Sequence, residues 1–457
     1  MVSIGFLGLQ TFLSTSCTDN TKPVTPKADI PKWQPKYGEL IPDSEAILHL
    51  PKGFTYKIIA RKGERMSDGL VQPDKPDGMA TFIGRNGRII LIRNHELMPT
   101  NFGPFGADDE LIDKIDASKI YDFRKGNIPC NGGTTTLVIN EETLTVEKSW
   151  LSLAGTIRNC AGGPTPWGSW ISCEEIAIPP GNAYEKGHGY NFEVPARSDI
   201  NLADPIPLKA MGQFNHEAVC VDHRTGIVYQ TEDREDGLIY RFLPHEKGNL
   251  KRGGILQALA IKGQKSLRTR NWRGDNGSFP KNEPLEVEWL DLEQVEEVPE
   301  DNLRGRGFAK GAAMFARGEG MWFGGGEVYF ACTSGGRSKT GQVFRYTPSP
   351  DEGTTSEKNN PGKLELFLEP NDTDLLKHCD NLTIAPWGDI ILCEDRKHPR
   401  AVGVTQKGQF YHLAESLHYK SEFAGGVFSP SGKTYFVNIQ HAGLTVAIQG
   451  PWQQGVS

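Results

Sequence analysis

An internal repeat constrains the fold of this chain more than any other feature. Each copy has a polar start, a short strand, a tight turn and an apolar strand that ends in acidic residues. One copy runs from Cys160 to Glu174 and another from Asp380 to Glu394, and both have a Trp-Gly turn in the middle. The two spacings are equal at 14 residues, so the copies predict the same local structure twice.

Four further copies keep this order but differ in their side chains. They span residues 77–96, 217–233, 319–333 and 426–440. Alternating segments between the copies predict outer strands at residues 135–139, 239–243, 343–347 and 364–368. Six copies at intervals of roughly 45 to 100 residues are typical of propeller blades. We therefore predict an all-β, six-bladed β-propeller with a few short helical insertions.

Composition supports this fold class and excludes others. The 52 glycines, 30 prolines and 37% hydrophobic content leave few segments that could form long helices. The net charge is -7 and no basic run is present, so the chain lacks the positive surface that nucleic-acid binding requires. We expect the insert at residues 248–300 to add a blade edge and a short helix.

The first 37 residues differ from the rest. An apolar run over residues 2–13 precedes Cys17, and a polar, Pro-rich segment follows. This order predicts an export signal and a tether, with lipidation at Cys17 as the anchor. No Lys or Arg precedes the apolar run, and Ser14 stands where bacterial lipoproteins usually carry Leu. A cleaved leader with an incidental cysteine is the alternative.

We therefore predict an exported protein, either periplasmic or associated with the outer membrane as a lipoprotein. No other segment approaches the roughly 20 apolar residues that span a bilayer. Residues 38–457 are predicted to form one propeller domain that acts as a monomer on a small-molecule substrate.

The cysteines fall into two kinds. Cys173, Cys220, Cys332 and Cys393 lie in or beside apolar runs, where a free cysteine behaves as a small buried hydrophobe. Cys160 lies instead among polar and glycine residues. That context favours a chemical role for Cys160.

Polar side chains recur in register at the strand ends of the copies. In a propeller the innermost strand of each blade lines the central channel, so these side chains should converge. Converging carboxylates lose hydration and repel one another, which bound cations offset. Carboxylates suit Ca²⁺, and a thiolate points to a transition metal beside it. We predict a metal cluster in the channel, with ligands among Cys160, Glu174, Glu175, Glu217, Glu232, Glu319, Asp380, Glu394 and Glu96.

Single residues allow other interpretations. A lone glutamate at a blade rim is more often solvated or paired with arginine. His95 and His216 precede Glu96 and Glu217 directly, and strand alternation turns such neighbours away from the axis. Hydrogen bonding is therefore favoured over metal binding for both histidines.

Arg317 is the candidate for substrate binding. It lies two residues before Glu319, so on an extended chain both side chains face the same side. A guanidinium beside a metal cluster can hold a phosphate through two parallel hydrogen bonds. The alternative is that Arg317 only neutralises a neighbouring carboxylate.

At these motifs the chain resembles the PhoX-type alkaline phosphatases of bacteria, over residues 77–442. The motifs are Arg158-Asn159-Cys160-Ala161-Gly162-Gly163, Pro166-Trp167-Gly168, Cys173-Glu174-Glu175, Asn215-His216-Glu217, Thr231-Glu232-Asp233, Ala316-Arg317-Gly318-Glu319-Gly320, Cys379-Asp380-Asn381 and Cys393-Glu394-Asp395. The resemblance implies a six-bladed propeller that hydrolyses phosphoesters. It also implies two ferric and three calcium ions around a bridging oxo group.

The resemblance further implies roles for single residues. Cys160 would bind iron, Arg317 would bind phosphate, and the acidic residues Glu174, Glu217, Glu319 and Asp380 would bind metal. We count Arg317, Glu319 and Cys160 as catalytic and Asn159 as a second substrate contact. Family members commonly carry a twin-arginine export signal, and no arginine pair occurs near the start of this chain.

The predicted function is that of an alkaline phosphatase, which releases phosphate from organic phosphomonoesters with iron and calcium as cofactors. One alternative is a calcium-dependent propeller lactonase or esterase, which needs a histidine base at the channel. Another is a non-catalytic surface lipoprotein with structural calcium. Iron found together with calcium would favour the first function over both alternatives.

Overall fold

The computed structural model describes residues 33–452 except 126–127, 182, 276–277 and 299. Residues 32–457 form one compact unit. The predicted export segment up to residue 32, with the lipidation site Cys17, lies outside the described residues.

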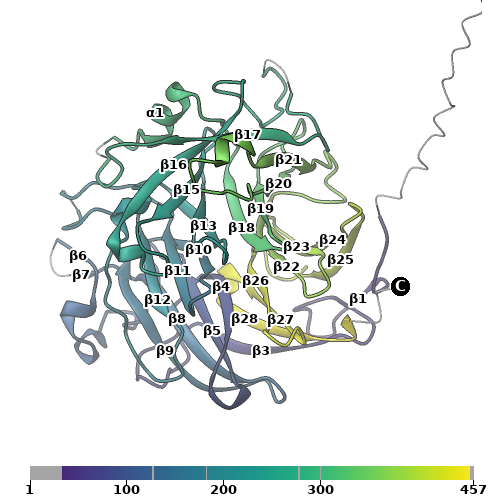
Figure 1. Ribbon diagram of the computed structural model, residues 1–457. Helices are drawn as coiled ribbons and strands as arrows, with labels where there is room; N and C mark the ends of the chain where they lie inside the picture. Colours follow the sequence, from purple (N-terminus) through teal and green to yellow (C-terminus); the bar gives the residue numbers. More distant parts are fainter. Residues whose placement is uncertain (1–32, 126–127, 182, 276–277, 299, 453–457) are drawn as a thin grey trace, which may run out of the picture. The chain divides into compact units, whose positions relative to one another are not determined.

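Five β-sheets surround a common centre (Figure 1). The first consists of β4 (Pro76–Ile83), β5 (Ile89–His95), β8 (Gly132–Asn140) and β9 (Thr145–Thr156). The second consists of β10 (Asn159–Pro164), β11 (Ser169–Glu174) and β12 (Asn191–Pro195). The third has nine strands in the order β13-β14-β15-β16-β17-β21-β20-β19-β18.

The bounds of these nine strands are β13 (His216–Val221), β14 (Val228–Glu232), β15 (Ile239–Pro244), β16 (Gly254–Ile261), β17 (Leu285–Asp291), β18 (Gly318–Gly324), β19 (Glu327–Cys332), β20 (Gln342–Thr347) and β21 (Lys363–Leu368). The fourth sheet consists of β22 (Cys379–Ile384), β23 (Ile390–Glu394), β24 (Arg400–Val404) and β25 (Phe410–Glu415). The fifth consists of β26 (Phe423–Phe428), β27 (Thr434–Ile439), β28 (Leu444–Gln449) and β3 (Thr55–Arg61).

Short elements complete the fold. Two small sheets pair β1 (Leu40–Ile41) with β2 (Leu50–Pro51), and β6 (Phe123–Arg124) with β7 (Ile128–Pro129). The α-helix α1 (Leu303–Lys310) follows the predicted insert. The 3₁₀ helices are η1 (Arg85–Gly87), η2 (Ile112–Lys114), η3 (Ala117–Lys119), η4 (Lys209–Met211), η5 (Leu250–Arg252), η6 (Glu357–Asn359) and η7 (Gln440–Ala442).

The six sequence copies are six antiparallel strand pairs, as predicted. They are β4/β5, β10/β11, β13/β14, β18/β19, β22/β23 and β26/β27. The first strands of these pairs pack against one another in a closed ring, in the order β4-β10-β13-β18-β22-β26-β4. The fold is therefore all-β and propeller-like.

The prediction of six separate blades needs correction. The hydrogen bonds define five sheets around the centre, because β17 pairs with both β16 and β21. This strand comes from the insert, whose residues we expected to form a blade edge. By pairing on both of its sides, β17 joins the third copy to the fourth.

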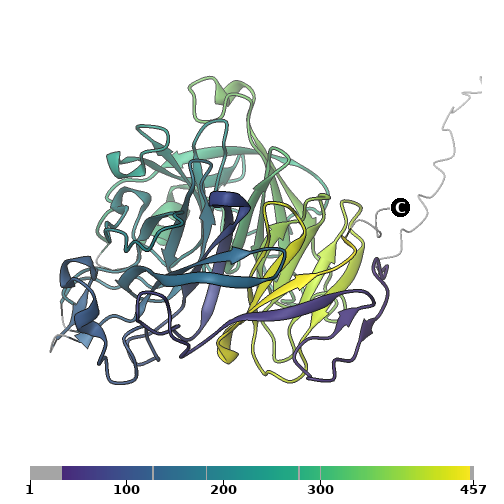
Figure 2. The same cartoon turned by 90° about the horizontal axis from the view of Figure 1, so that it is seen from below.

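The last sheet is completed by a strand from the other end of the unit. β3 pairs with β28 from Arg61 and Leu444 to Thr55 and Gln449. Figure 2 shows the purple β3 running beside the yellow C-terminal strands. Residues nearly 400 positions apart therefore hold the ring closed.

Small residues allow the first strands to approach closely. A Cβ atom added to Gly78 would lie 2.5 Å from the Ala161 Cα, and one added to Gly320 would lie 2.6 Å from the Asn381 Cα. Real Cβ contacts are longer than this, so both positions require glycine. The cysteines between Cys130 and Cys393 are free and buried, as predicted for the four in apolar runs.

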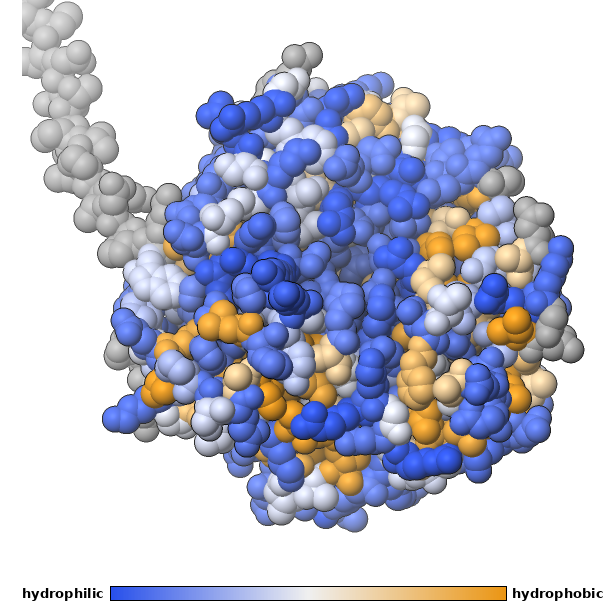
Figure 3. Space-filling view, turned by 180° about the vertical axis from the view of Figure 1, so that it is seen from behind, coloured by the Kyte–Doolittle hydropathy of each residue, from blue (hydrophilic) through white to orange (hydrophobic). Residues whose placement is uncertain are grey.

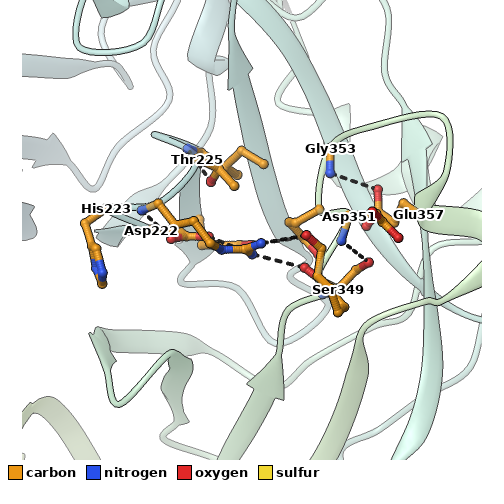
Figure 4. Close-up of polar contacts among 12 residues, drawn as sticks. Asp222, His223, Thr225, Ser349, Asp351, Gly353 and Glu357 are labelled. Carbon is orange, nitrogen blue, oxygen red and sulfur yellow. Dashed lines mark hydrogen bonds and ion pairs between the residues drawn. The ribbon is translucent and has the colours of Figure 1, made fainter.

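The two halves of the nine-stranded sheet are also tied at their outer ends. Arg224, in the turn between β13 and β14, donates to the carbonyl oxygens of Pro350 (2.7 Å) and Ser349 (3.0 Å). Figure 4 shows this turn, with Asp222 and Thr225, facing the loop that contains Ser349. The tie lies at the far ends of these strands and takes no part in the site described below.

The surface is mostly polar. The face shown in Figure 3 is largely hydrophilic, with hydrophobic residues in separate groups. The large exposed hydrophobic side chains, which include Ile83 and Ile200, are scattered along the chain. Within the described residues, no helix has the length and apolar character needed to span a membrane.

Candidate metal centre

Every first strand carries a β-bulge at its start. In each pair two residues of the first strand oppose one residue of the second. Such a bulge bends the strand and changes the direction of a side chain. The first bulged residues are Asp77, Cys160, Glu217, Glu319, Asp380 and Gly425, so five of six carry a side chain that can bind metal.

A second set of polar residues follows the second strands. The backbone N–H of each donates to the carbonyl oxygen of the residue before the first strand of the same copy, as from Glu175 to Arg158 (2.9 Å). The residues in this second set are Glu96, Glu175, Asp233, Thr333, Asp395 and Gln440. This shared hydrogen bond gives them equivalent places around the ring.

The side chains form three overlapping groups of candidate ligands. The groups are Cys160–Glu175–Glu217, Glu217–Glu319–Asp380 and Asp380–Asp395–Glu422, and within each the ligand atoms lie within 4.8 Å of one another. Glu217 and Asp380 each belong to two groups. The three groups therefore form one continuous series of candidate ligands along the ring. We call these residues, together with the nearby Asp77 and Asp233, the hub.

Burial and like charges dominate the electrostatics of the hub. Desolvation by burial, followed by repulsion from neighbouring carboxylates, raises the pKa of Asp77, Glu217, Glu319 and Glu422. The same causes raise the pKa of Asp380 to about 8. Ionised hub carboxylates therefore require cations close by.

Two arginines flank the hub. Arg317 donates from Nε and Nη2 to the two oxygens of Asp233 (2.7 and 2.8 Å), and from Nη2 to Glu319 Oε1 (2.8 Å). Arg158 donates from Nε to Glu96 Oε1 (3.1 Å) and also pairs with Glu175. These carboxylates raise the pKa of both guanidinium groups against the opposing effect of burial.

Both arginines are positioned to bind a further anion. Their side chains are about one third exposed, at 33% for Arg158 and 36% for Arg317. Neither Nη1 atom donates a hydrogen bond to any residue in the described ranges. Both residues have a positive φ, 47° and 55°, a conformation that non-glycine residues rarely adopt and that clusters at functional sites.

Unpaired polar atoms mark the same region. Asn215 Oδ1, Thr333 Oγ1 and Gln440 Oε1 are buried and make no hydrogen bond within the described part of the protein. Each belongs to one of the equivalent positions before a first strand or after a second strand. Buried polar atoms are normally paired, so these three atoms are available to an ion or water in the hub.

Three predicted ligands point away from the hub, and the prediction is corrected for them. They are Glu174, Glu232 and Glu394, which pair directly with the residues before the bulges. Glu174 accepts from His188 Nδ1 (2.7 Å) and the backbone of Ile157 (2.9 Å). Strand alternation explains the difference, since adjacent residues face opposite sides.

The other two of these glutamates also accept hydrogen bonds from the protein. Glu232 accepts from the Tyr240 hydroxyl (2.8 Å) and the Leu238 backbone (3.1 Å). Glu394 accepts from Arg400 Nε (2.7 Å) and Nη2 (2.6 Å) and from the Lys377 backbone (2.7 Å). Protein donors therefore occupy both oxygens of Glu174 and Glu394 and one oxygen of Glu232, whose Oε1 lies 3.6 Å from Arg304 Nη1 without a hydrogen bond.

Two further predicted site residues lie outside the three ligand groups. Asn159, expected to contact substrate, is fully buried; its Nδ2 donates to Ser172 Oγ (2.9 Å) and its Oδ1 accepts from Thr156 (2.6 Å). Glu96 lies outside the three ligand groups and binds Arg158 and Gln440 instead. Both residues support neighbours of the hub.

Five of the predicted ligands do come together, namely Cys160, Glu175, Glu217, Glu319 and Asp380. The histidines hydrogen-bond as expected, His95 to Thr135 Oγ1 (2.8 Å) and His216 to the Gly212 carbonyl (2.9 Å). Sequence reasoning did not select Asp395 and Glu422 as ligands. Asp395 follows Glu394 as Glu175 follows Glu174, and this parallel was the available signal.

A family model described as alkaline phosphatase PhoX matches residues 35–147 and 134–443, which is most of the chain. The chain belongs to the alkaline phosphatase PhoX family. The resemblance found in the sequence is thereby confirmed, and the enzyme class is that of a phosphatase. No curated protein matched this chain.

Among solved structures, PhoX of Pseudomonas fluorescens in complex with vanadate, a transition state analogue, has a TM-score of 0.66 at 17% identity and covers 90% of this chain and 97% of its own. At this identity the match shows the common fold. A more distant match is a structural genomics protein of unknown function from Bacteroides thetaiotaomicron. It has a TM-score of 0.44 at 9% identity and covers 87% of this chain and 76% of its own. XC5397 of Xanthomonas campestris, a gluconolactonase, is also more distant, with a TM-score of 0.39 at 10% identity over 91% of this chain and 98% of its own.

Proposed function

We propose that the hub binds a cluster of iron and calcium ions and that this member of the PhoX family uses it to hydrolyse phosphomonoesters. The observation that carries the proposal is the continuous chain of ligand groups beside two arginines with a free Nη1. A phosphoryl group is the ligand that both cations and guanidinium forks bind well.

The donor set fits the proposed ions. Carboxylates from Glu217, Glu319 and Asp380 suit hard cations, and the Cys160 thiol suits a transition metal. Within the described chain, carboxyl groups outnumber guanidinium groups around the hub, so added positive charge would relieve their repulsion. The unpaired oxygens of Asn215, Thr333 and Gln440 supply further acceptors.

The protein's own groups would hold and orient the substrate. When bound, the cations would supply Lewis acidity that polarises a phosphoryl group. Asp233 holds the planar fork of Arg317 through two hydrogen bonds, which leaves Nη1 to donate to a phosphoryl oxygen. Glu96 and Glu175 hold Arg158 in the same way. Fixed donors of this kind stabilise developing negative charge without reorganising.

The six repeated strand pairs surround the site, because their first strands form a closed ring. In the related protein from Pseudomonas fluorescens, vanadate is bound. An analogue of phosphate in a relative of the same fold supports phosphate as the group recognised here.

We further propose that residues 38–457 are the catalytic domain, that the protein acts as a monomer, and that residues 1–37 export it and anchor it at Cys17. The support is the order of apolar run, cysteine and polar segment. Metabolic labelling with a fatty acid tests the anchor. Labelled wild-type protein in the membrane fraction and unlabelled Cys17→Ala protein are expected, whereas unlabelled wild-type protein would refute lipidation.

The substrate proposal is tested at Arg317. Arg317→Lys keeps the charge but loses the planar fork, so we expect turnover of a phosphomonoester to fall and inhibition by free phosphate to weaken, with unchanged metal content. Arg345→Lys, on the outer strand β20 and paired with Glu365, is the control. Wild-type kinetics and phosphate inhibition in Arg317→Lys would assign Arg317 to charge balance and refute the clamp.

A further inference from the structure

A second cluster of metal-binding side chains lies outside the hub. Asp122, which precedes β6, Cys130, which follows β7, and His188, in the segment between β11 and β12, are each 0–1% exposed. Their ligand atoms lie within 4.8 Å of one another. None of them belongs to the repeated strand pairs, so the hub arrangement does not explain the cluster.

The imidazole of His188 has the surroundings of a metal ligand. Its Nδ1 lies 2.7 Å from Glu174 Oε1, and its Nε2 lies 3.1 Å from Asp122 Oδ2. The Cys130 thiol lies within hydrogen-bonding reach of the same ring. A metal-binding histidine almost always donates its second ring N–H to a carboxylate, which fixes its tautomer. Glu174 would accept that hydrogen bond here.

We propose that Asp122, Cys130 and His188 bind one divalent transition ion of the zinc type, with Glu174 positioning the imidazole. Imidazole nitrogen, carboxylate oxygen and thiolate sulfur are all ligands of zinc. Bonds of about 2.0–2.2 Å at a tetrahedral ion separate a nitrogen and an oxygen ligand by roughly 3.3 Å. The 3.1 Å between His188 Nε2 and Asp122 Oδ2 is slightly shorter than this separation, so a small movement of either side chain would admit the ion.

Hydrogen bonds around the cluster leave the ligand atoms in place. Asp122 Oδ1 accepts from the Lys186 backbone (3.2 Å), so Oδ2 faces His188. Glu174 accepts from the backbone N–H of Ile157 and Gly189 (both 2.9 Å). These bonds hold both carboxylates from the side away from the three candidate ligand atoms of Asp122, Cys130 and His188 without using Asp122 Oδ2.

The cluster lies where two long segments outside the ring of first strands meet. Asp122 and Cys130 belong to the segment between β5 and β8, and His188 to the segment between β11 and β12. The Tyr121 hydroxyl also donates across this junction to the Gly187 carbonyl (2.7 Å). An ion held from both sides would link the two segments and stabilise them, because a metal clip closes loops that are otherwise costly to order.

The rival arrangement uses the same residues without metal. In it a protonated His188 lies between Asp122 and Glu174, and the Cys130 thiol keeps its proton. The two arrangements differ in the thiol. A bound ion requires the thiolate of Cys130. The metal-free arrangement of Asp122, His188 and Glu174 does not require a thiolate.

The test uses protein produced in medium in which cobalt replaces zinc. Cobalt bound by a thiolate gives a charge-transfer absorption in the near ultraviolet. Cys160→Ser protein is used throughout, because Cys160 belongs to the hub. We expect this protein to show thiolate-to-cobalt absorption, and a second substitution, Cys130→Ser, to abolish the absorption. The matched control is Cys220→Ser in place of Cys130→Ser, since Cys220 is buried but lies outside every ligand group.

Glu174→Gln sharpens the test. Loss of the carboxylate behind a ligating histidine lowers metal affinity about 10- to 100-fold, whereas Glu232→Gln, at the equivalent place of the next copy, should leave it unchanged. Folded Cys160→Ser protein without thiolate-to-cobalt absorption would overturn the proposal, as would absorption that survives Cys130→Ser. If the double variant fails to fold, the spectrum of folded Cys160→Ser protein decides alone. Neither result bears on the hub.

Discussion

Two sets of acidic residues, one position apart in the sequence, have opposite surroundings. Glu175, Asp233 and Asp395 lie at the hub, whereas Glu174, Glu232 and Glu394 face away from it. The hub set meets other carboxylates and two arginines. The outer set meets backbone N–H groups, a tyrosine, a histidine or an arginine.

This difference teaches what makes a buried carboxylate a metal ligand. The side chains have the same chemistry, so chemistry does not distinguish the sets. Their neighbours do, because the hub set lies beside other carboxylates whereas the outer set lies among protein donors. A carboxylate that is saturated by its own protein has no place for a cation, whereas one that faces like charges needs a cation to remain ionised.

The largest effect is expected at Glu217, which belongs to two of the three ligand groups. Glu217→Gln should remove bound metal and lower phosphatase activity by more than the roughly 10- to 100-fold typical of outer-shell changes. Glu232→Gln, in the same copy but facing away, is the matched control and should retain metal and activity. Equal losses in both variants, measured by elemental analysis and turnover, would break the comparison.

Glu394→Ala should act on stability instead. It leaves Arg400 buried without its partner, which lies 2.6 Å away, and removing one member of a buried pair costs about 3–5 kcal/mol. Denaturant unfolding should show this loss, while the folded fraction keeps its metal. Metal loss in folded Glu394→Ala protein would place this residue with the hub set.

A smaller effect is expected for Cys160→Ser, because the serine oxygen still suits the hard cations. Iron content should fall, and turnover should fall on the order of 10- to 100-fold. Cys173→Ser and Cys393→Ser, at buried cysteines outside every ligand group, should leave iron unchanged. The assignment of Cys160 to the metal site fails if its variant keeps both iron and rate.

The smallest effect concerns pH after exhaustive chelation. The pKa of Asp380 is raised from 3.8 to about 8, and the pKa of Glu217 and Glu319 is also raised. The folded chelated protein then binds more protons than the unfolded chain, so its stability should fall as pH rises from about 4 to 8. Cations should cancel this trend in metal-loaded protein. Melting curves that rise with pH for both forms would contradict the raised pKa values.

Much of the fold was predictable because the repeat is local. The turn and the two strands of each copy lie within about 15 to 20 residues, and all six form antiparallel pairs. The joining of the third and fourth copies was not predictable. It depends on β17, which pairs across more than 70 residues with β21.

The candidate site was predictable as a region and less so in its members. Cys160, Glu217, Glu319 and Asp380 were found because each starts a first strand. The choice between Glu174 and Glu175 depends on register, since a shift of one residue turns a side chain to the other face. The second cluster has no sequence signal, because Asp122, Cys130 and His188 come together only through the fold of two long segments.

The central claim is that the hub is a metal site on which phosphatase activity depends. Elemental analysis of wild-type protein, combined with turnover of a phosphomonoester before and after chelation and after re-addition of iron and calcium, tests it most directly. We expect iron and calcium together in the active protein, loss of activity with the metals, and recovery on re-addition. Undiminished turnover by protein shown to be free of metal would contradict the account.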